Sequence, residues 1–395
     1  MLVREDFRTG NALMNEGRRQ AEHHRIACFI SPHGFGHAAR AAAVMEALGS
    51  RYPSCHFDIF TTVPPQFFED SLSVPYSLYP VTSDIGLVQK SAFVEDLDLT
   101  LERLNAFLPF DPDLVSDLSR TVIRNRCELI LCDIAPLGIA VGRHCGVPTV
   151  LIENFTWDFI YGGYPSMAAA MGVHIDYLHR MFSAADHHIQ TEPVCFRRKA
   201  GLIVGPISRR FRSNRAETRQ RLRIPFSQKI VLVTTGGIPG SYRFLDRLAS
   251  FREACFILPG SSRLTEFRDN TVLLPHHSDI YHPDLVNASD VVIGKAGYST
   301  IAEVYSAGVP FGYVARKHSP ESPGLVDFID RNMDGIALGE EGFNSGRWVE
   351  KLPQLLSMPR QHQRRSNGSE EIAAYIGRLI EANETTAGTG RRESL

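Results

Sequence analysis

The sequence lacks a long apolar run. No stretch approaches the roughly 20 uninterrupted apolar residues that a membrane-spanning helix needs, and the most apolar segment, residues 129–141, is broken by Asp133 and Pro136. Residues 1–24 are polar and have no apolar core of the kind found in secretory signals. We therefore expect a cytoplasmic protein without a transmembrane segment, for which a peripheral membrane contact stays open.

Cysteine motifs are also missing. The chain has seven scattered cysteines and no Cys-x-x-Cys pair, which excludes a recognisable zinc spacing or disulfide framework and indicates buried free thiols in a reducing compartment. Two Asp-x-Asp pairs, at 96–98 and 111–113, imitate a metal-binding signature. The first lies in a helical pattern and the second precedes a helix, so we predict surface and capping acids there and no metal site.

Neither sign of charge dominates. The 42 Lys and Arg residues nearly balance the 44 Asp and Glu residues, for a net charge of -2, so there is no general electrostatic case for a nucleic-acid partner. A content of 43% hydrophobic and 22% charged residues excludes a mostly disordered chain. The length of 395 residues favours two domains.

What the chain does have is an alternation of β-rich apolar runs and helical patterns from residue 25 onwards, which indicates βαβ units and parallel sheets. We expect strands at 25–31, 56–62, 128–133, 148–152, 187–191 and 202–204, and again at 229–235, 254–258, 271–274, 290–294 and 310–315. These two series predict two similar α/β domains that face each other across a cleft, where ligands of open sheets bind.

The predicted divisions follow changes in composition. They are a polar tail (1–24), an N-terminal domain (25–205), a basic linker (206–228), a C-terminal domain (229–368), a helix expected to pack back on the N-terminal domain (369–383) and a second tail (384–395). Acidic residues interrupt the basic linker, a pattern more typical of a solvated helix than of a nucleic-acid or membrane site.

The first glycine turn, residues 31–39, lies between an expected strand and a helix expected at 38–50. Its Gly34-x-Gly36 pattern matches part of a dinucleotide fingerprint, but Asp58 lies near the start of the second strand, where the fingerprint needs an acid at the end. The match to an NAD site is therefore incomplete.

Two histidines in this turn offer another chemistry. His33 and His37 lie where a histidine can remove a proton at neutral pH and where a helix start can receive an anion. Asp133 ends a strand at the same sheet edge and would orient one of them. Equally, His37 would cap the helix, His33 would fill the turn, and Asp133 would cap a helix at 135–145.

Two further glycine turns follow strands of the second half. Gly236, Gly237 and Gly240 allow close backbone approach to phosphates, or form an ordinary turn, and no Gly-Lys-Ser/Thr supports a Walker-type hydrolase.

The turn at 290–303 contains Gly297, and a helix is expected to start at Ser299 or Thr300, whose first-turn NH groups would bind phosphate. Glu303, one turn inside, would accept hydrogen bonds from ribose hydroxyls. Alternatively, Thr300-x-x-Glu303 is a capping box.

Five dispersed segments resemble those of known proteins. They read HGFGHAAR (33–40), NFTWDFIY (154–161), GGIPG (236–240), ASDVVIGKAGYSTIAE (288–303) and NGSEEIAAYI (367–376). Together they resemble the GT-B glycosyltransferases over about 25–383, most closely the glycosyltransferase-like N-terminal half of plant L-arabinokinases and more distantly the peptidoglycan N-acetylglucosaminyltransferases. The resemblance implies an α/β fold of the GT-B class, with two facing Rossmann-like, doubly wound parallel-sheet domains.

The resemblance also implies an activity. It is transfer of a hexosyl or N-acetylhexosaminyl group from a nucleotide sugar, most simply a UDP-sugar, to the hydroxyl of a sugar, lipid-linked or small-molecule acceptor, with no metal, cofactor or nucleic acid. Two alternatives stay open: a non-catalytic nucleotide-sugar or sugar-binding module, and a sugar-nucleotide 2-epimerase on the same fold.

Site residues follow from the same resemblance. The implied catalytic residues are His37, as base, and Asp133, as its orienter. The implied donor-binding residues are Gly236, Gly237, Gly240, Gly297, Ser299, Thr300, Glu303 and Glu321. The implied acceptor-side residues are His33, Gly34, Gly36, Asn154, Trp157 and Asp158. Around Glu321 the chain departs from the usual acid–amide pair that holds the donor sugar, so the identity of the sugar stays open.

Overall fold

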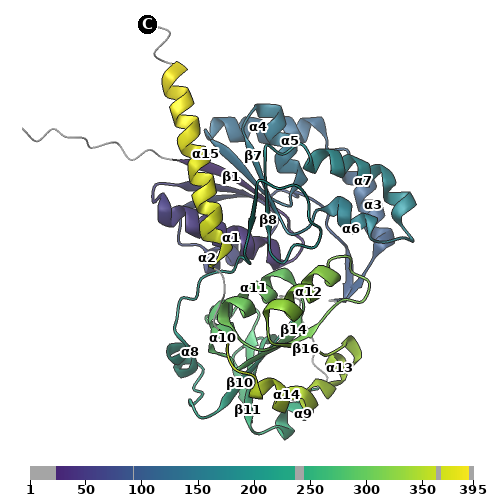
Figure 1. The fold of residues 1–395 in the computed structure, drawn as a ribbon, viewed down its shortest axis with the longest axis vertical. Coiled ribbons are helices and arrows are strands. Elements are labelled where there is room, and N and C mark those ends of the chain that lie inside the picture. Colours follow the sequence, from purple (N-terminus) through teal and green to yellow (C-terminus); the bar gives the residue numbers. More distant parts are fainter. Residues whose placement is uncertain (1–23, 92, 236–243, 362–365, 391–395) are drawn as a thin grey trace, which may run out of the picture.

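Two seven-stranded sheets organise the chain (Figure 1). The computed structural model describes residues 24–91, 93–235, 244–361 and 366–390. The N-terminal sheet has the order β3-β2-β1-β6-β7-β8-β9, and all neighbouring strands in it run parallel. Its strands are β1 (Arg25–Ile30), β2 (His56–Phe60), β3 (Tyr76–Tyr79), β6 (Leu129–Asp133), β7 (Thr149–Glu153), β8 (His187–Thr191) and β9 (Leu202–Val204).

Helices cover both faces of this sheet, so its central strands are apolar on both sides. From β1, Ile26 and Ile30 face one core and Ala27 and Phe29 face the other. The helices are α1 (Phe35–Arg51), α2 (Pro65–Ser71), α3 (Leu97–Phe107), α4 (Pro112–Arg124), α5 (Pro136–Cys145), α6 (Trp157–Gly162) and α7 (Ala168–Phe182), and a small hairpin pairs β4 (Gln89–Ser91) with β5 (Val94–Glu95).

The C-terminal sheet has the order β12-β13-β11-β10-β14-β15-β16, in which β12 alone runs antiparallel to its neighbour. Its strands are β10 (Lys229–Thr234), β11 (Ala254–Ser262), β12 (Glu266–Arg268), β13 (Thr271–Pro275), β14 (Val291–Lys295), β15 (Phe311–Val314) and β16 (Gly335–Ala337). The helices of this part are α8 (Arg215–Arg221), α9 (Leu245–Ser250), α10 (His282–Ala288), α11 (Tyr298–Ala307), α12 (Ser322–Asn332), α13 (Glu340–Ser345), a 3-10 turn (Arg347–Lys351) and α14 (Leu352–Ser357).

The last helix, α15 (Gly368–Gly390), returns to the N-terminal domain and lies along α1 (Figure 1). Ile372, Ile376 and Ile380 enter the same core as the apolar face of α1. The helix continues past residue 383, where the sequence predicted its end, into the segment predicted to be a tail.

The predicted fold class, two parallel-sheet α/β domains, is confirmed. One difference matters for the site: α1 begins at Phe35 and not at residue 38, because Gly34 adopts a positive φ of 73° and turns the chain into the helix at once. His37 therefore lies in the first turn of α1. Asp96 and Asp111 cap α3 and α4, as predicted.

Candidate functional site

The N-termini of α1 and α11 face each other across the two domains. A Cβ added to Gly36 would lie 3.6 Å from Oγ of Ser299. Each helix follows a buried parallel strand and is capped by a glycine, Gly34 or Gly297, with no side-chain capping bond. The capping-box alternative at Thr300 is therefore wrong. The uncapped NH groups make this part of the cleft attractive to an anion.

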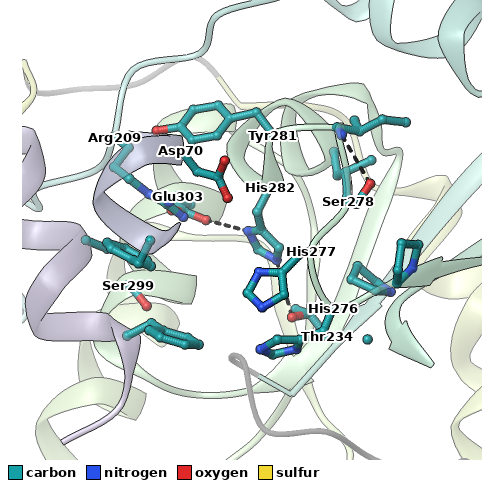
Figure 2. Close-up of a pocket in the computed structure, with 18 of the residues that line it drawn as sticks. Asp70, Arg209, Thr234, His276, His277, Ser278, Tyr281, His282, Ser299 and Glu303 are labelled. Atoms are coloured by element: carbon teal, nitrogen blue, oxygen red, sulfur yellow. Dashed lines mark hydrogen bonds and ion pairs between the residues drawn. The ribbon is translucent and has the colours of Figure 1, made fainter. Parts of the chain in front are cut away.

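A cavity of about 250 Å³ opens beside α11. From the N-terminal domain it is lined by Phe35, Phe67 and Asp70, and from the C-terminal domain by the ends of β10, β11 and β13 and the start of α11 (Figure 2). Ser299, Thr300 and Glu303 also line it. The structure therefore brings these three predicted donor residues to one cavity, whereas Gly236, Gly237 and Gly240 lie outside the described residues.

Glu303 is buried and has two partners (Figure 2). Its Oε1 accepts hydrogen bonds from Nε and Nη2 of Arg209, at 3.1 and 2.9 Å, and its Oε2 lies 3.0 Å from Nδ1 of His282. Burial alone would raise the pKa of Glu303, but Arg209 and His282 outweigh it and lower the pKa to about 2. The carboxylate is thus ionised, and a ribose would have to share it with these partners.

Glu321 lies away from this cavity. It precedes α12 and pairs with Arg316, whose Nη1 also donates to Oε1 of Glu95 at 2.8 Å. Because Glu95 belongs to β5, Arg316 joins the two domains. The donor-sugar role of Glu321 stays a prediction.

His37 and Asp133 meet inside the N-terminal domain. Nδ1 of His37 lies 3.1 Å from Oδ1 of Asp133, and both side chains are almost fully buried. Arg40 donates to the same carboxylate, from Nε at 2.8 Å and from Nη2 at 2.6 Å. Burial would raise the pKa of Asp133, but Arg40 and His37 lower it, so Asp133 is ionised. Asp133 does not cap α5, whose N-cap is Ala135 with no side-chain bond.

Arg40 connects this pair to the opposite domain. Its guanidinium lies 4.6 Å from the ring centre of Tyr298, the first residue of α11, and its Nη1 donates to Oδ1 of Asn154 at 2.7 Å. Asn154, a predicted acceptor-side residue, thus contacts Arg40, which also pairs with Asp133. Arg40 therefore contacts both the His37–Asp133 pair and the first residue of α11 in the opposite domain.

His33 is held as a neutral ring. Its Nδ1 accepts a hydrogen bond from the NH of Leu87 at 3.3 Å, and Trp157 packs edge-on against it with ring centres 5.2 Å apart. Burial, followed by the neighbouring charge of His37, lowers the pKa of His33 well below its usual range. Trp157 therefore lies beside both histidines.

The polar contacts of Asp158 are made with residues other than His33 and His37. Its Oδ2 accepts from Nη2 of Arg198 at 2.7 Å and lies 3.0 Å from Nδ1 of His179. Its acceptor-side role stays a prediction.

Sequence reasoning missed Arg40, Arg209 and His282. Arg40 had a signal, since it lies three residues after His37 and shares its helix face. No signal in the sequence pointed to Arg209 and His282, because they come from separate segments and meet only at Glu303.

The residues that the structure describes contain neither a metal-ligand cluster nor a membrane-spanning helix. No group of three or more His, Cys, Asp or Glu side chains there is placed to hold a metal ion. None of the described helices combines the length and apolarity needed to cross a membrane.

Comparisons with known proteins agree with this fold. No family model matches the chain. L-arabinokinase of Arabidopsis thaliana is 28% identical over 372 residues, which are 92% of this chain but 35% of that protein, so the chain spans about a third of that relative's length. The resemblance predicted to L-arabinokinases is confirmed.

Solved glycosyltransferase structures share the architecture. MurG of Acinetobacter baumannii superposes with a TM-score of 0.52 at 14% identity, over 90% of this chain and 99% of that chain. A UDP-glucosyltransferase of Polygonum tinctorium gives 0.58 at 14% identity, over 92% and 94%. At such identities the likeness establishes the fold alone: this chain has the GT-B fold of the glycosyltransferases.

Proposed function

We propose that the protein transfers a sugar from a nucleotide-diphosphate sugar to a hydroxyl acceptor. The observation that supports this most directly is the buried pair of His37, in the first turn of α1, and Asp133, at the end of β6, opposite the uncapped start of α11. One helix end would receive the donor phosphates and the other would carry the base. The names of the UDP-glucosyltransferase and of MurG, which share this fold, agree with such an activity.

In the proposed reaction, His37 carries its proton on Nδ1, and this N–H would donate a hydrogen bond to Oδ1 of Asp133, 3.1 Å away, which orients the ring. Nε2 then accepts the proton of the acceptor hydroxyl. The acceptor oxygen bonds to the sugar carbon while that carbon's bond to the phosphate oxygen breaks, and its electron pair leaves with the nucleoside diphosphate. NH groups at the start of α11 would stabilise the charge that develops there.

The cavity would hold the nucleoside part. Ser299 and Thr300, in the first turn of α11, line its wall, and Glu303 lies one turn further along the same helix. The flat rings of Phe35 and Phe67, stacked 5.2 Å apart, form an apolar wall on the opposite domain. A UDP-sugar is the donor we propose, with the sugar and acceptor left to experiment.

The test starts with a donor. A thermal-shift screen with UDP-, GDP- and ADP-sugars identifies a ligand of the folded state, because binding raises the melting temperature. Donor hydrolysis and transfer to a panel of hydroxyl acceptors are then measured for the protein and for His37→Ala. We expect the substitution to lower turnover by about 100-fold or more while donor binding survives.

The control is His144→Ala, which removes an exposed histidine of α5 and should change neither quantity. Normal turnover in His37→Ala would refute the assignment of the base. If no nucleotide sugar or nucleoside diphosphate binds, the proposed function as a whole is wrong.

One contact favours a second candidate, a nucleotide-sugar-binding module without catalysis. Arg40 donates two hydrogen bonds to Asp133 and neutralises its charge, so the carboxylate already has a structural partner that requires no catalytic role. Donor binding without hydrolysis or transfer, across the same panels, would support the module and contradict the transferase.

A further inference from the structure

Arg316 is buried between two glutamates that come from different domains. Its Nη1 donates to Oε1 of Glu95, at the end of β5, at 2.8 Å, and its Nη2 donates to Oε1 of Glu321, just before α12. The side chains of Arg316, Glu95 and Glu321 are only 5%, 9% and 11% exposed. A buried guanidinium needs a carboxylate partner, and Glu321 supplies one from the same domain. Glu95 therefore adds a contact that the neutralisation of Arg316 does not require.

The short helix α6 places this triad of Glu95, Arg316 and Glu321 near the proposed base. The helix begins at Trp157, whose ring centre lies 6.3 Å from that of His37, and it ends at Gly163, its C-cap. Gly163 packs so closely against Pro320, the residue before Glu321, that the side chain of Pro320 leaves no room for a Cβ. The 6 residues of α6 span about 9 Å. The proposed base therefore lies near one end of α6, and the triad lies near the other.

The triad also lies near the start of α11. Arg316 follows β15, which pairs with β14, and the last residue of β14, Lys295, precedes the Gly297 N-cap by two positions. Burial and then the charge of Arg316 lower the pKa of Lys295 to about 8, and Glu321 and Glu95 oppose them, as expected for charges that lie close together. A sugar that is joined to a diphosphate at the start of α11 and directed towards α1 would therefore pass the triad.

One oxygen of Glu321 is not used by Arg316. Oε2 bonds to no residue that the structure describes, and it is not one of the fully buried polar atoms, so it can accept a hydrogen bond from a ligand hydroxyl. A guanidinium and a carboxylate often form two parallel hydrogen bonds. Here Glu95 holds Nη1 of Arg316 and leaves Nη2 for Glu321. Without Glu95, Nη1 would be free to bind Oε2 as well.

We propose that Glu95 is a positioning residue for the donor sugar: it holds Arg316 from the opposite domain and so keeps Oε2 of Glu321 available to a sugar hydroxyl. This inference rests on the proposed function and on the donor-sugar role predicted for Glu321. When the domains separate, Glu95 leaves with the N-terminal domain, and Arg316 binds both oxygens of Glu321. The sugar then loses its acceptor oxygen. The cavity proposed for the nucleoside has no residue of the triad in its wall, so Glu95 acts on the sugar alone.

The experiment compares, by calorimetry, the affinity for UDP with the affinities for UDP-glucose, UDP-galactose and UDP-N-acetylglucosamine. Glu95→Met keeps the length of the side chain and removes its oxygens, while Arg316 stays paired with Glu321. For the tightest UDP-sugar, we expect Glu95→Met to weaken binding by about 10-fold, as for the loss of one hydrogen bond to a charged group, and to leave UDP binding unchanged. Glu95→Gln, which retains an acceptor oxygen, should recover part of this loss. Arg316→Lys cannot hold two carboxylates in a fixed fork, so it should behave as Glu95→Met does.

Glu341→Met is the matched control, since it removes an exposed ion pair with Arg347 inside the C-terminal domain, and it should change neither affinity. The inference is overturned if Glu95→Met weakens UDP and the UDP-sugar by the same factor, as a general loss of structure would, or if it weakens neither. If Glu95→Met does not fold, an Arg316→Lys variant that binds both ligands as the unsubstituted protein does overturns it equally. Failure of the unsubstituted protein to bind UDP or any of the three UDP-sugars would instead contradict the proposed function with a UDP-sugar donor.

Discussion

Glu303 is predicted to stabilise the C-terminal domain through its two partners, independently of any ligand. The pKa of its carboxyl falls from 4.5 to about 2 in the folded state because Arg209 and His282 outweigh the effect of burial. By linkage, this lowering of the pKa corresponds to about 3 kcal/mol of folding free energy. Glu303→Gln keeps the shape of the side chain and removes its charge.

The pH dependence of this loss follows from the sign of the change. A carboxyl with a lowered pKa in the folded state contributes fully above about pH 4.5, and its contribution disappears as the pH falls through about 2. We therefore expect Glu303→Gln to cost about 3 kcal/mol at pH 7 and about 1 kcal/mol at pH 3.

Urea unfolding followed by the fluorescence of Trp348, which lies in the C-terminal core, measures this cost in a Trp157→Phe background. Glu350→Gln, which changes an exposed glutamate of the 3-10 turn, is the control and should be nearly neutral at both pH values. An equal cost of Glu303→Gln at pH 7 and pH 3 would refute the electrostatic reasoning. No cost at either pH, combined with weaker UDP binding, would make Glu303 a ligand of the nucleotide and nothing more.

Two further predictions concern the loop that supports His33. Gly86 has a φ of +59°, and a Cβ there would lie 2.7 Å from Cβ of His33, whereas Gly339 has a φ of +64° and open space around it. Gly86→Ala should therefore lower both the melting temperature and donor turnover. Gly339→Ala should cost about 1 kcal/mol of folding free energy through backbone strain and so lower the melting temperature, with turnover unchanged. Equal effects of the two substitutions would show that His33 is not held by this contact. Burial raises the pKa of Asp84 to about 8 despite a hydrogen bond from Ser31, so its ionisation favours the unfolded chain and stability should decrease between about pH 4 and pH 8. Asp84→Asn should flatten a series of melting temperatures measured from pH 5 to pH 9, and slopes identical to those of the unsubstituted protein would contradict this.

The sheet architecture could be predicted because each central strand is recognisable from a few consecutive residues. Runs such as Lys229–Thr234 are apolar on both faces, and glycine turns follow them directly. The short edge strands β3, β12 and β16 escaped prediction, since their partly exposed residues follow no clear apolar pattern. The start of α1 was placed too late because the apolar run begins at Ala38, while Gly34 fixes the turn.

The candidate site could be predicted only where a residue with suitable side-chain chemistry lies at a recognisable strand end or helix start. His37 and Asp133 could be paired because His37 follows β1 and Asp133 ends the neighbouring β6, at the same sheet edge. The competing interpretation of Thr300 as a helix cap was plausible from spacing and failed because the chain enters α11 through Gly297.

The sequence by itself determined the two parallel-sheet domains, the glycine turns at their strand ends and the residue types available for acid–base chemistry and phosphate binding. The reason is that hydrophobic periodicity and glycine backbone freedom act over a few neighbouring residues. The tertiary structure alone decided which charges are neutralised. Arg40 reaches Asp133 across 93 residues of sequence, and Arg209 reaches Glu303 across 94. Such pairing depends on distances that no local pattern encodes.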